Sequence, residues 1–251
     1  MLAASSMPHG LQVELAGNPV SEPYIDMTLA VFDQAGVPYV LKGNPPAYYV
    51  EHTIPNCDAV TIEKDWSAAS YFYALSALKK DIRLHMAGLT FDSLQGDSVV
   101  PEIFKQLGVK SEMVGMAIEI EQDEPAVEEL EYDFTNTPDL FPSVAVTCAA
   151  LGIKARLTGL FHQRVKESDR LNAVATELKK MGCRLDVTDE GLVIYPSKLT
   201  PTEPIPSYND HRIAMAFSVL KAQFPQLEVK DPEVVSKSFP TFWEMLERCI
   251  S

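Results

Sequence analysis

The segment RVKESDR, at residues 164–170, combines three cations and two carboxylates directly before a predicted amphipathic helix. Lys166 and Arg170 are four residues apart, so on a helix they would face each other and repel unless an anion or a carboxylate lay between them. A helix N-terminus adds positive potential and free N–H donors that suit phosphate or carboxylate. The segment is therefore either an anion-binding site or a solvated helix entry, in which Glu167 and Asp169 pair with the cations.

Three more charged positions stand where other helices are expected to begin. The string YNDHR opens an apolar helix, where His211 and Arg212 would be poorly placed unless their side chains reach a cleft. Asp139 and Asp210 have the simpler interpretation of helix N-caps. Lys237, before the last helix, has the simpler interpretation of a surface lysine. Asp139 and Asp210 occupy equivalent positions in a repeat, which favours helix starts on one side of a domain.

The net charge of -14 makes these basic positions informative. Such a charge argues against a broad nucleic-acid-binding surface, which needs a basic face. The sequence contains no nucleophile elbow, P-loop, GxGxxG string or metal-ligand spacing that would indicate another chemistry. Together the charged segments predict a receptor for a small polyanion. Its expected members are Lys166, Arg170, Arg212, Lys237, Asp139 and Glu167.

An internal repeat indicates how these segments are positioned. Gly17, Gly88 and Gly159 each end a predicted strand and recur at about 71-residue intervals. After each glycine comes an amphipathic helix, clearest from Ser168 or Asp169 to Met181, and then a hairpin, clearest at residues 184–195. Strand–helix–strand succession favours parallel pairing through right-handed crossovers. The sequence therefore predicts an α/β fold of repeated βαβαββ units.

Runs of small and apolar residues supply the other helix of each unit. They lie at 67–77, 138–150 and 210–222 and predict buried helices. A short strand is expected at 227–229, and a last amphipathic helix at 239–250. Because residues 1–6 match only the tail of a buried helix, the chain is expected to begin inside a unit. We therefore expect residues 1–64 to be the last part of an N-terminal domain, and residues 65–251 to form a C-terminal domain.

The remaining composition suggests a protein of the cytoplasm. No run of eighteen apolar residues is present, so no membrane span is expected. The four cysteines are scattered without a CxxC pair, which suits a reducing compartment. Cys148 lies in an apolar run and is expected in the core.

The strings RVKESDRL, YNDHRIAM and KSFPTFWE, in this order and spacing, resemble EPSP synthases. The resemblance covers essentially the whole chain, including SEPYIDMTL and SLQGD. It implies two domains of the inverse α/β-barrel type, each of three βαβαββ units, that close on shikimate 3-phosphate and phosphoenolpyruvate. The implied reaction adds the 5-hydroxyl of shikimate 3-phosphate to phosphoenolpyruvate and then eliminates phosphate, without a cofactor or metal.

The resemblance also implies roles for particular residues. Asp139 matches the acid–base aspartate beside the hydroxyl, and Glu167 matches the proposed proton donor to the methylene carbon. Such proton transfers suit carboxylates that are held near cations and desolvated on closure. Arg170, Arg212 and Lys237 match contacts to phosphoenolpyruvate.

The other implied contacts concern the second substrate. Lys166 matches a contact to shikimate 3-phosphate, with His211 alongside. Ser21 and Tyr24 match residues at the shikimate phosphate, on the other side of the cleft. Where many family members have Asn before the Arg-Val-Lys-Glu string, this chain has His162–Gln163.

The N-terminal lysine and arginines of the family, and its Ser-Ser-Gln stretch, have no counterpart here. We therefore expect a truncated chain that is inactive, or nearly so, without the missing N-terminal domain. Two alternatives stay open. One is another enolpyruvyl transferase, such as the cell-wall enzyme that acts on a nucleotide sugar, and the other is a phosphate-binding module without catalysis.

Overall fold

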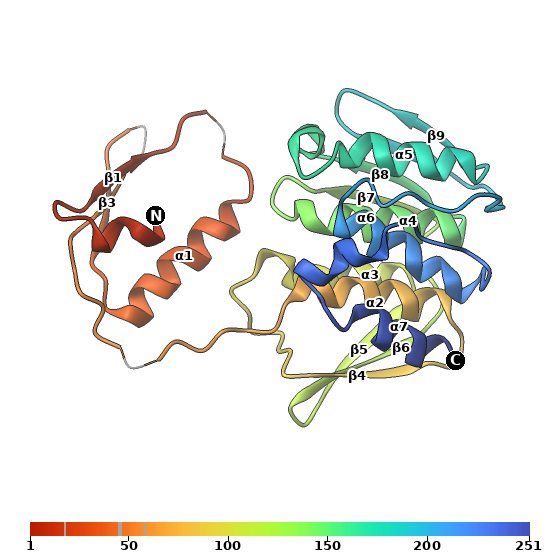
Figure 1. Ribbon diagram of the computed structural model, residues 1–251, viewed down its shortest axis with the longest axis horizontal. Coiled ribbons are helices and arrows are strands. Elements are labelled where there is room, and N and C mark those ends of the chain that lie inside the picture. The colour runs from red at the N-terminus through yellow and green to blue at the C-terminus, as the bar shows by residue number, and fades with distance from the viewer. Residues whose placement is uncertain (18, 45–46, 58) are drawn as a thin grey trace. The chain divides into compact units, whose positions relative to one another are not determined.

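The computed structural model describes residues 1–17, 19–44, 47–57 and 59–251, which divide into two compact units (Figure 1). Unit 1 comprises Met1–Glu63 and Asp92–Gly96. Unit 2 comprises Lys64–Phe91 and Asp97–Ser251. Each unit has its own cluster of buried apolar side chains.

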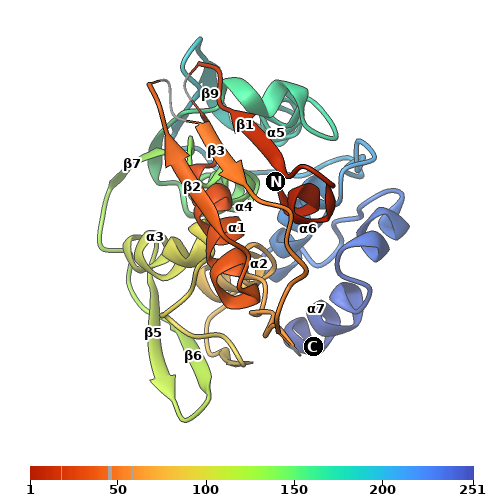
Figure 2. The same ribbon diagram turned by 90° about the vertical axis from the view of Figure 1, so that its left-hand side faces the viewer.

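In unit 1, an α-helix packs against a small sheet (Figure 2). Its elements are the 3-10 helix η1 (Leu2–Ser6), β1 (Leu11–Glu14), α1 (Glu22–Ala35), β2 (Tyr39–Lys42) and β3 (Ala47–Val50). The strands are antiparallel in the order β1-β3-β2. Phe32 and Ala35 of α1 pack on Val50 of the sheet. The helix α1 ends at Gly36, whose left-handed backbone (φ 66°) closes the last turn.

Unit 2 contains the remaining helices and strands. In chain order they are α2 (Trp66–Leu78), β4 (Arg83–Ala87), η2 (Gly96–Val99), α3 (Val100–Gln106), β5 (Val109–Val114), β6 (Ala117–Gln122), β7 (Glu129–Asp133), η3 (Pro138–Leu140), α4 (Phe141–Leu151), β8 (Lys154–Thr158), η4 (Phe161–Val165), α5 (Arg170–Lys180), β9 (Arg184–Val187), β10 (Leu192–Tyr195), α6 (His211–Ser218), η5 (Val219–Ala222), η6 (Pro232–Lys237) and α7 (Phe242–Ile250). The first residue of η2, Gly96, belongs to unit 1.

The predicted repeat is confirmed by the sheet topology. The run β7-α4-β8-α5-β9-β10 is a complete βαβαββ copy, in which β7 and β8 are parallel and β8, β10 and β9 pair antiparallel. Its strand order is β7-β8-β10-β9. The last three strands of this order, β8-β10-β9, correspond to the order β4-β6-β5 in the sheet of the preceding copy. The sheet of unit 1, β1-β3-β2, repeats the same pattern.

The copy that follows β10 departs from the prediction. The prediction of a strand at 227–229 is wrong. Within the described residues, only an isolated parallel bridge joins Ile205 to Val229. Pro204 and Pro206 flank Ile205 and cannot donate backbone hydrogen bonds, so the pairing does not extend. The expected long helix at 210–222 likewise ends at Ser218 and continues as the 3-10 helix η5.

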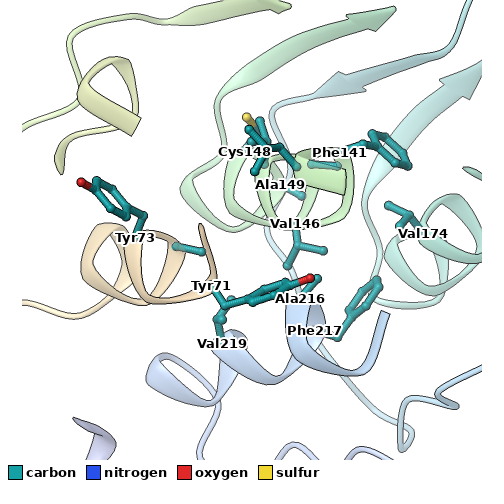
Figure 3. Close-up of a cluster of buried hydrophobic side chains, with 14 of the residues drawn as sticks. Tyr71, Tyr73, Phe141, Val146, Cys148, Ala149, Val174, Ala216, Phe217 and Val219 are labelled. Carbon is teal, nitrogen blue, oxygen red and sulfur yellow. The ribbon is translucent and has the colours of Figure 1, made fainter. Parts of the chain in front are cut away.

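The core of unit 2 is built around α2, α4 and α6, which pack against one another. Small side chains such as Ala145 and Ala216, both fully buried, let the helices approach closely, while the rings of Tyr71 and Phe217 fill the space between them (Figure 3). β10 alternates buried and half-buried residues, and β4 alternates half-buried residues that pack on the core with exposed ones, so one face of each sheet covers the helices. In unit 2 the helices therefore lie inside and the sheets outside, which is the inverse α/β arrangement that was predicted.

Two smaller expectations concern individual residues and helices. Cys148 is fully buried in α4, as predicted, and burial raises the pKa of its thiol to about 12. Among the residues that the structure describes, no helix has both the length and the apolar character needed to cross a bilayer.

Gly191, at the β9–β10 turn, has no room for a side chain. A Cβ there would lie 2.0 Å from the carbonyl oxygen of Leu157 on β8. We expect Gly191→Ala to lower the free energy of unfolding by about 1–3 kcal/mol, because β8 and β10 must separate. Urea denaturation measures the loss.

Gly115, in the β5–β6 turn, provides the control for Gly191→Ala. It has a positive φ of 62°, but a Cβ at this position would have no neighbouring atom within 4 Å. Gly115→Ala should therefore cost only the backbone strain, about 1 kcal/mol. Equal losses in the two variants would mean that crowding at Leu157 contributes nothing.

Candidate active site

Arg170 lies at the centre of the candidate site, in the first turn of α5. Asp169 caps this helix by accepting a hydrogen bond from the backbone N–H of Asn172 at 3.1 Å. The Arg170 side chain is only 1% exposed, and its guanidinium donates to three carboxylates. Nε contacts Asp210 at 2.8 Å and Nη1 contacts Asp139 at 3.0 Å, while Nη2 contacts Glu167. The fork-shaped guanidinium is the cation best suited to several carboxylates at once.

The predicted pairing of Lys166 with Arg170 on one helix is wrong. Lys166 follows η4 in an extended conformation (φ −81°, ψ −158°), and α5 begins only at Arg170. The Asp169 cap sets this starting point, so Lys166 is outside the helix. The alternative of a solvated helix entry is also wrong for Arg170, because its guanidinium is buried and Asp169 serves as a cap.

Asp139 joins the two arginines of the site. Its Oδ1 accepts from Arg170, and its Oδ2 accepts from Arg212 Nη2 at 2.7 Å. The expectation that Asp139 caps a helix is wrong, because α4 begins after the 3-10 turn η3 and its start has no side-chain cap. Gln163 fixes this turn by donating to the carbonyl of Pro138 at 2.6 Å. The Asp139 side chain is 27% exposed, so a ligand can reach it.

Asp210 is both a helix cap and an ion-pair partner. As predicted, it caps α6, accepting from the backbone N–H of Arg212 at 2.9 Å. It also accepts from Arg170 and from the Ser168 hydroxyl at 3.0 Å, and it is completely buried. Burial alone would raise the pKa of Asp210, but the Arg170 guanidinium and these hydrogen bonds outweigh burial and hold it below its ordinary value.

Two lysines and two histidines surround this cluster. Lys166 and Lys237 are exposed, and neither has an ion pair within the described ranges. Burial, followed by the charges of Arg212 and Lys237, lowers the pKa of His211. Burial and Lys166 likewise lower the pKa of His162. Both imidazoles are therefore mainly neutral at pH 7.

Buried polar atoms without a hydrogen-bond partner gather around the same cluster. The part of the chain that the structure describes has seven such side-chain atoms. Six of them belong to His162, Gln163, His211, Arg212 and Tyr71. Burial is the main reason that the pKa of Tyr71 rises to about 12. The side chain of Arg212 opposes this rise, and the charges of Asp139 and Arg170 also act on the Tyr71 hydroxyl. The six atoms are His162 Nδ1 and Nε2, Gln163 Oε1, His211 Nδ1, Arg212 Nε and Tyr71 Oη. Buried polar groups are rarely left without partners, so this concentration favours a ligand site.

Asp97 is a residue of this region that sequence reasoning did not identify. It accepts a hydrogen bond from the hydroxyl of Ser67, in the first turn of α2. Burial raises its pKa to about 6, and the negative charge of Asp139 adds to the rise. Its only signal in the sequence is its place in the SLQGD string.

The remaining predicted site residues belong to unit 1. Ser21 is the N-cap of α1 and has a left-handed backbone (φ 58°). Tyr24, in the first turn of that helix, is 67% exposed. Unit 2 therefore brings together Asp139, Glu167, Arg170 and Arg212 by direct contact, whereas Ser21 and Tyr24 belong to unit 1.

A family model described as EPSP synthase (3-phosphoshikimate 1-carboxyvinyltransferase) matches residues 1–246 of the chain. The chain belongs to the EPSP synthase family. A curated 3-phosphoshikimate 1-carboxyvinyltransferase of Bacteroides fragilis is 36% identical over 243 residues, covering 96% of this chain and 59% of the relative. One from a Sulfurovum species is 32% identical over 250 residues, covering 98% and 58%. The chain thus spans a little under three fifths of the length of these EPSP synthase relatives.

Solved structures show the same fold. An EPSP synthase from Acinetobacter baumannii aligns with a TM-score of 0.74 at 24% identity, covering 99% of this chain and 58% of that structure. An enolpyruvyl transferase from Streptomyces tendae aligns with a TM-score of 0.63 at 17% identity, covering 98% and 57%. These similarities support the βαβαββ architecture that the EPSP synthase resemblance implies.

Arg170 should be necessary for the stability of unit 2. Arg170→Met would leave the buried Asp210 carboxylate without its cation, at a cost of about 3–5 kcal/mol in the free energy of unfolding. Urea denaturation at pH 7 measures this loss. The control is Arg248→Met, which removes an exposed pair with Glu244 and should change stability by less than about 0.5 kcal/mol. Similar effects of the two substitutions would contradict the central place of Arg170.

The Asp97 carboxyl should lower the free energy of unfolding as pH rises from about 4 to about 6. Its folded pKa of about 6 lies above the ordinary value of 3.8, so the folded state binds more protons between these two pH values. The folded state of the wild type is therefore penalised increasingly from about pH 4 to pH 6, and the penalty persists above this range. Asp97→Asn removes the penalty, so the variant should gain up to about 3 kcal/mol at pH 7 and nothing below pH 4.

Unfolding measured across pH 3.5–7.5 tests the Asp97 prediction. Asn can still accept the hydrogen bond from Ser67, which keeps the substitution conservative. Asp189→Asn, which removes an exposed carboxylate of the β9–β10 turn, is the control for the loss of one negative charge. A constant offset for Asp97→Asn would mean that this carboxyl does not titrate in the stated window.

Proposed function

We propose that the chain supplies the acid–base residues and the phosphoenolpyruvate-binding cations of a 3-phosphoshikimate 1-carboxyvinyltransferase. In this reaction the enolpyruvyl group passes from phosphoenolpyruvate to the 5-hydroxyl of shikimate 3-phosphate. The observation that carries the proposal is the Asp139 carboxylate held between the guanidinium groups of Arg170 and Arg212, with Glu167 on the same Arg170. Membership of the EPSP synthase family supports the assignment.

The shared arginine suits an addition followed by an elimination. In the addition, the 5-hydroxyl oxygen forms a bond to C2 of phosphoenolpyruvate and loses its proton, while C3 gains a proton. In the elimination, C3 loses a proton and the bond from C2 to the phosphate oxygen breaks, so that phosphate leaves. Asp139 takes the acid–base role at the hydroxyl, and Glu167 donates the proton to C3. Because both carboxylates bind Arg170, their relative orientation is set before substrate binds.

The cations have a separate role in this proposal. Arg212 and Lys237 meet the carboxylate and phosphate of phosphoenolpyruvate, for which charge-assisted hydrogen bonds are well suited. Arg170, whose side chain is only 1% exposed, acts by orienting Asp139 and Glu167 beside them. Lys166 meets the phosphate of shikimate 3-phosphate, with His211 alongside. The pKa of His211 is lowered by burial and by Arg212, so His211 acts as a neutral hydrogen-bonding group.

The whole reaction requires more than unit 2. The relatives are longer than this chain, which covers 58–59% of them. We propose that unit 1 belongs to the domain that binds the shikimate phosphate, through Ser21 and Tyr24, and that unit 2 forms most of a second domain. On this proposal, the 251 residues bind ligand but turn over slowly or not at all without the rest of the relatives' length.

A phosphate-binding function without catalysis is the second candidate. It is favoured by the exposed Lys166 and Lys237 and by the unpartnered buried atoms, all of which belong to unit 2. An assay of product with both shikimate 3-phosphate and a nucleotide-sugar acceptor separates the first candidate from other enolpyruvyl transferases.

The unpaired cysteines of the described residues suit a reducing compartment, which we propose to be the cytoplasm.

Calorimetric titration tests the proposed function directly. The chain is titrated with shikimate 3-phosphate, with and without phosphoenolpyruvate, and phosphate release is measured in parallel. We expect binding without release. Lys237→Ala should weaken the binding of phosphoenolpyruvate about tenfold, because one charge-assisted contact is lost.

Lys230→Ala is the matched control, since Lys230 is also an exposed lysine without an ion pair in the described residues. It should leave the affinity unchanged. Equal loss in both variants would indicate a nonspecific charge effect rather than a contact at position 237. The absence of any binding, including by a chain extended to the length of the relatives, would contradict the proposed function.

A further inference from the structure

Two consecutive residues before α6 have left-handed backbones. Tyr208 has φ 56° and Asn209 has φ 53°, directly before the buried Asp210. Asn tolerates this region, but a bulky residue such as Tyr occupies it only when its surroundings hold it there. Such strained positions persist where the neighbouring structure determines them, and they often lie beside functional residues.

The contacts of Tyr208 show what holds this backbone. Its hydroxyl donates to Glu177, a carboxylate of α5 that is only 1% exposed. Glu177 also accepts from Lys180 Nζ at 2.8 Å. The Ser207 carbonyl closes the turn by accepting from the N–H of Asp210 at 2.9 Å. Burial and the negative charge of Glu177 raise the pKa of the Tyr208 hydroxyl, so it remains a donor throughout the neutral range.

One face of α5 therefore holds the segment before α6 at two points. Arg170 and Glu177 are seven residues apart, which places them on the same side of the helix and about 10 Å apart along its axis. Arg170 binds Asp210, and Glu177 binds Tyr208. The two helices contact each other in unit 2. Both contacts act on the residues immediately before Arg212.

We propose that the Tyr208–Glu177 pair positions the Arg212 guanidinium for anion binding. By fixing the left-handed backbone at 208–209, the pair sets the direction in which α6 begins, and hence the path of the Arg212 side chain to Asp139. Tyr208 and Glu177 are positioning residues in this proposal, since both act through Arg212. The choice of phosphoenolpyruvate as the anion rests on the proposed function, whereas the effect on Arg212 does not.

The test compares Tyr208→Phe with the wild-type chain by two measurements. Side-chain N–H signals of arginine in 1H–15N spectra report on Arg212, whose buried Nε has no protein acceptor among the described residues, and on Arg170, whose Nε donates to Asp210. Calorimetry measures the affinity for phosphoenolpyruvate. We expect the Arg212 Nε–H signal to shift or broaden and the affinity to fall about tenfold.

Two further variants serve as controls. Tyr195→Phe removes a hydroxyl that donates to Asp186 at 3.0 Å on the exposed β9–β10 hairpin, so both measurements should match the wild type. Glu177→Gln keeps an acceptor for the Tyr208 hydroxyl and should retain most of the affinity. If Tyr208→Phe does not fold, Tyr208→Phe/Asn209→Gly gives the same test, because glycine accepts the left-handed backbone.

The outcomes separate this inference from the proposed function. A Tyr208→Phe chain that is less stable but keeps the Arg212 signal and the wild-type affinity would show a purely structural role and overturn the inference. If the wild type does not bind phosphoenolpyruvate, the proposed function fails. The Arg212 signal would then still decide whether the pair positions this side chain.

Discussion

The guanidinium of Arg170 is the interaction on which both the fold of unit 2 and its site depend. Removing a cation of this size from water is costly unless carboxylates and good geometry compensate. Here Asp139, Glu167 and Asp210 supply that compensation from different segments of the chain. The start of α5 is thereby tied to the starts of α4 and α6. The contacts that stabilise the domain also orient the two carboxylates that we assign to proton transfer.

The repeat explains why these segments meet. Each copy places the start of a buried helix at the same end of the domain, so Asp65, Asp139 and Asp210 lie shortly before α2, α4 and α6. Their functions nevertheless differ. Asp65 accepts from the N–H of Ala68 as a simple cap, and Asp139 binds two arginine side chains. Asp210 caps α6 and also binds the Arg170 guanidinium. The common architecture provides the position, and the neighbouring cations decide the use of each carboxylate.

Electrostatics at the site differ from those of the whole chain. The protein carries a net charge of -14, yet Lys166, Arg212 and Lys237 surround a cluster whose histidines are neutral. The carboxylates of the cluster balance the buried Arg170, which leaves the more exposed cations available to an anion. A buried network that is satisfied in this way is rigid, while the exposed charges around it can respond to a ligand.

The sequence by itself determined the features that depend on neighbouring residues. The βαβαββ repeat, the hairpin at 184–195, the Asp210 cap and the buried Cys148 all follow from local periodicity, turn chemistry and capping. Contacts between distant residues were decided only by the tertiary structure. Asp139 could not be distinguished from a cap because its partners Arg170 and Arg212 lie 31 and 73 residues away. The Tyr208–Glu177 contact and the raised pKa of Asp97 likewise depend on burial and on charges from other elements, which no local pattern records.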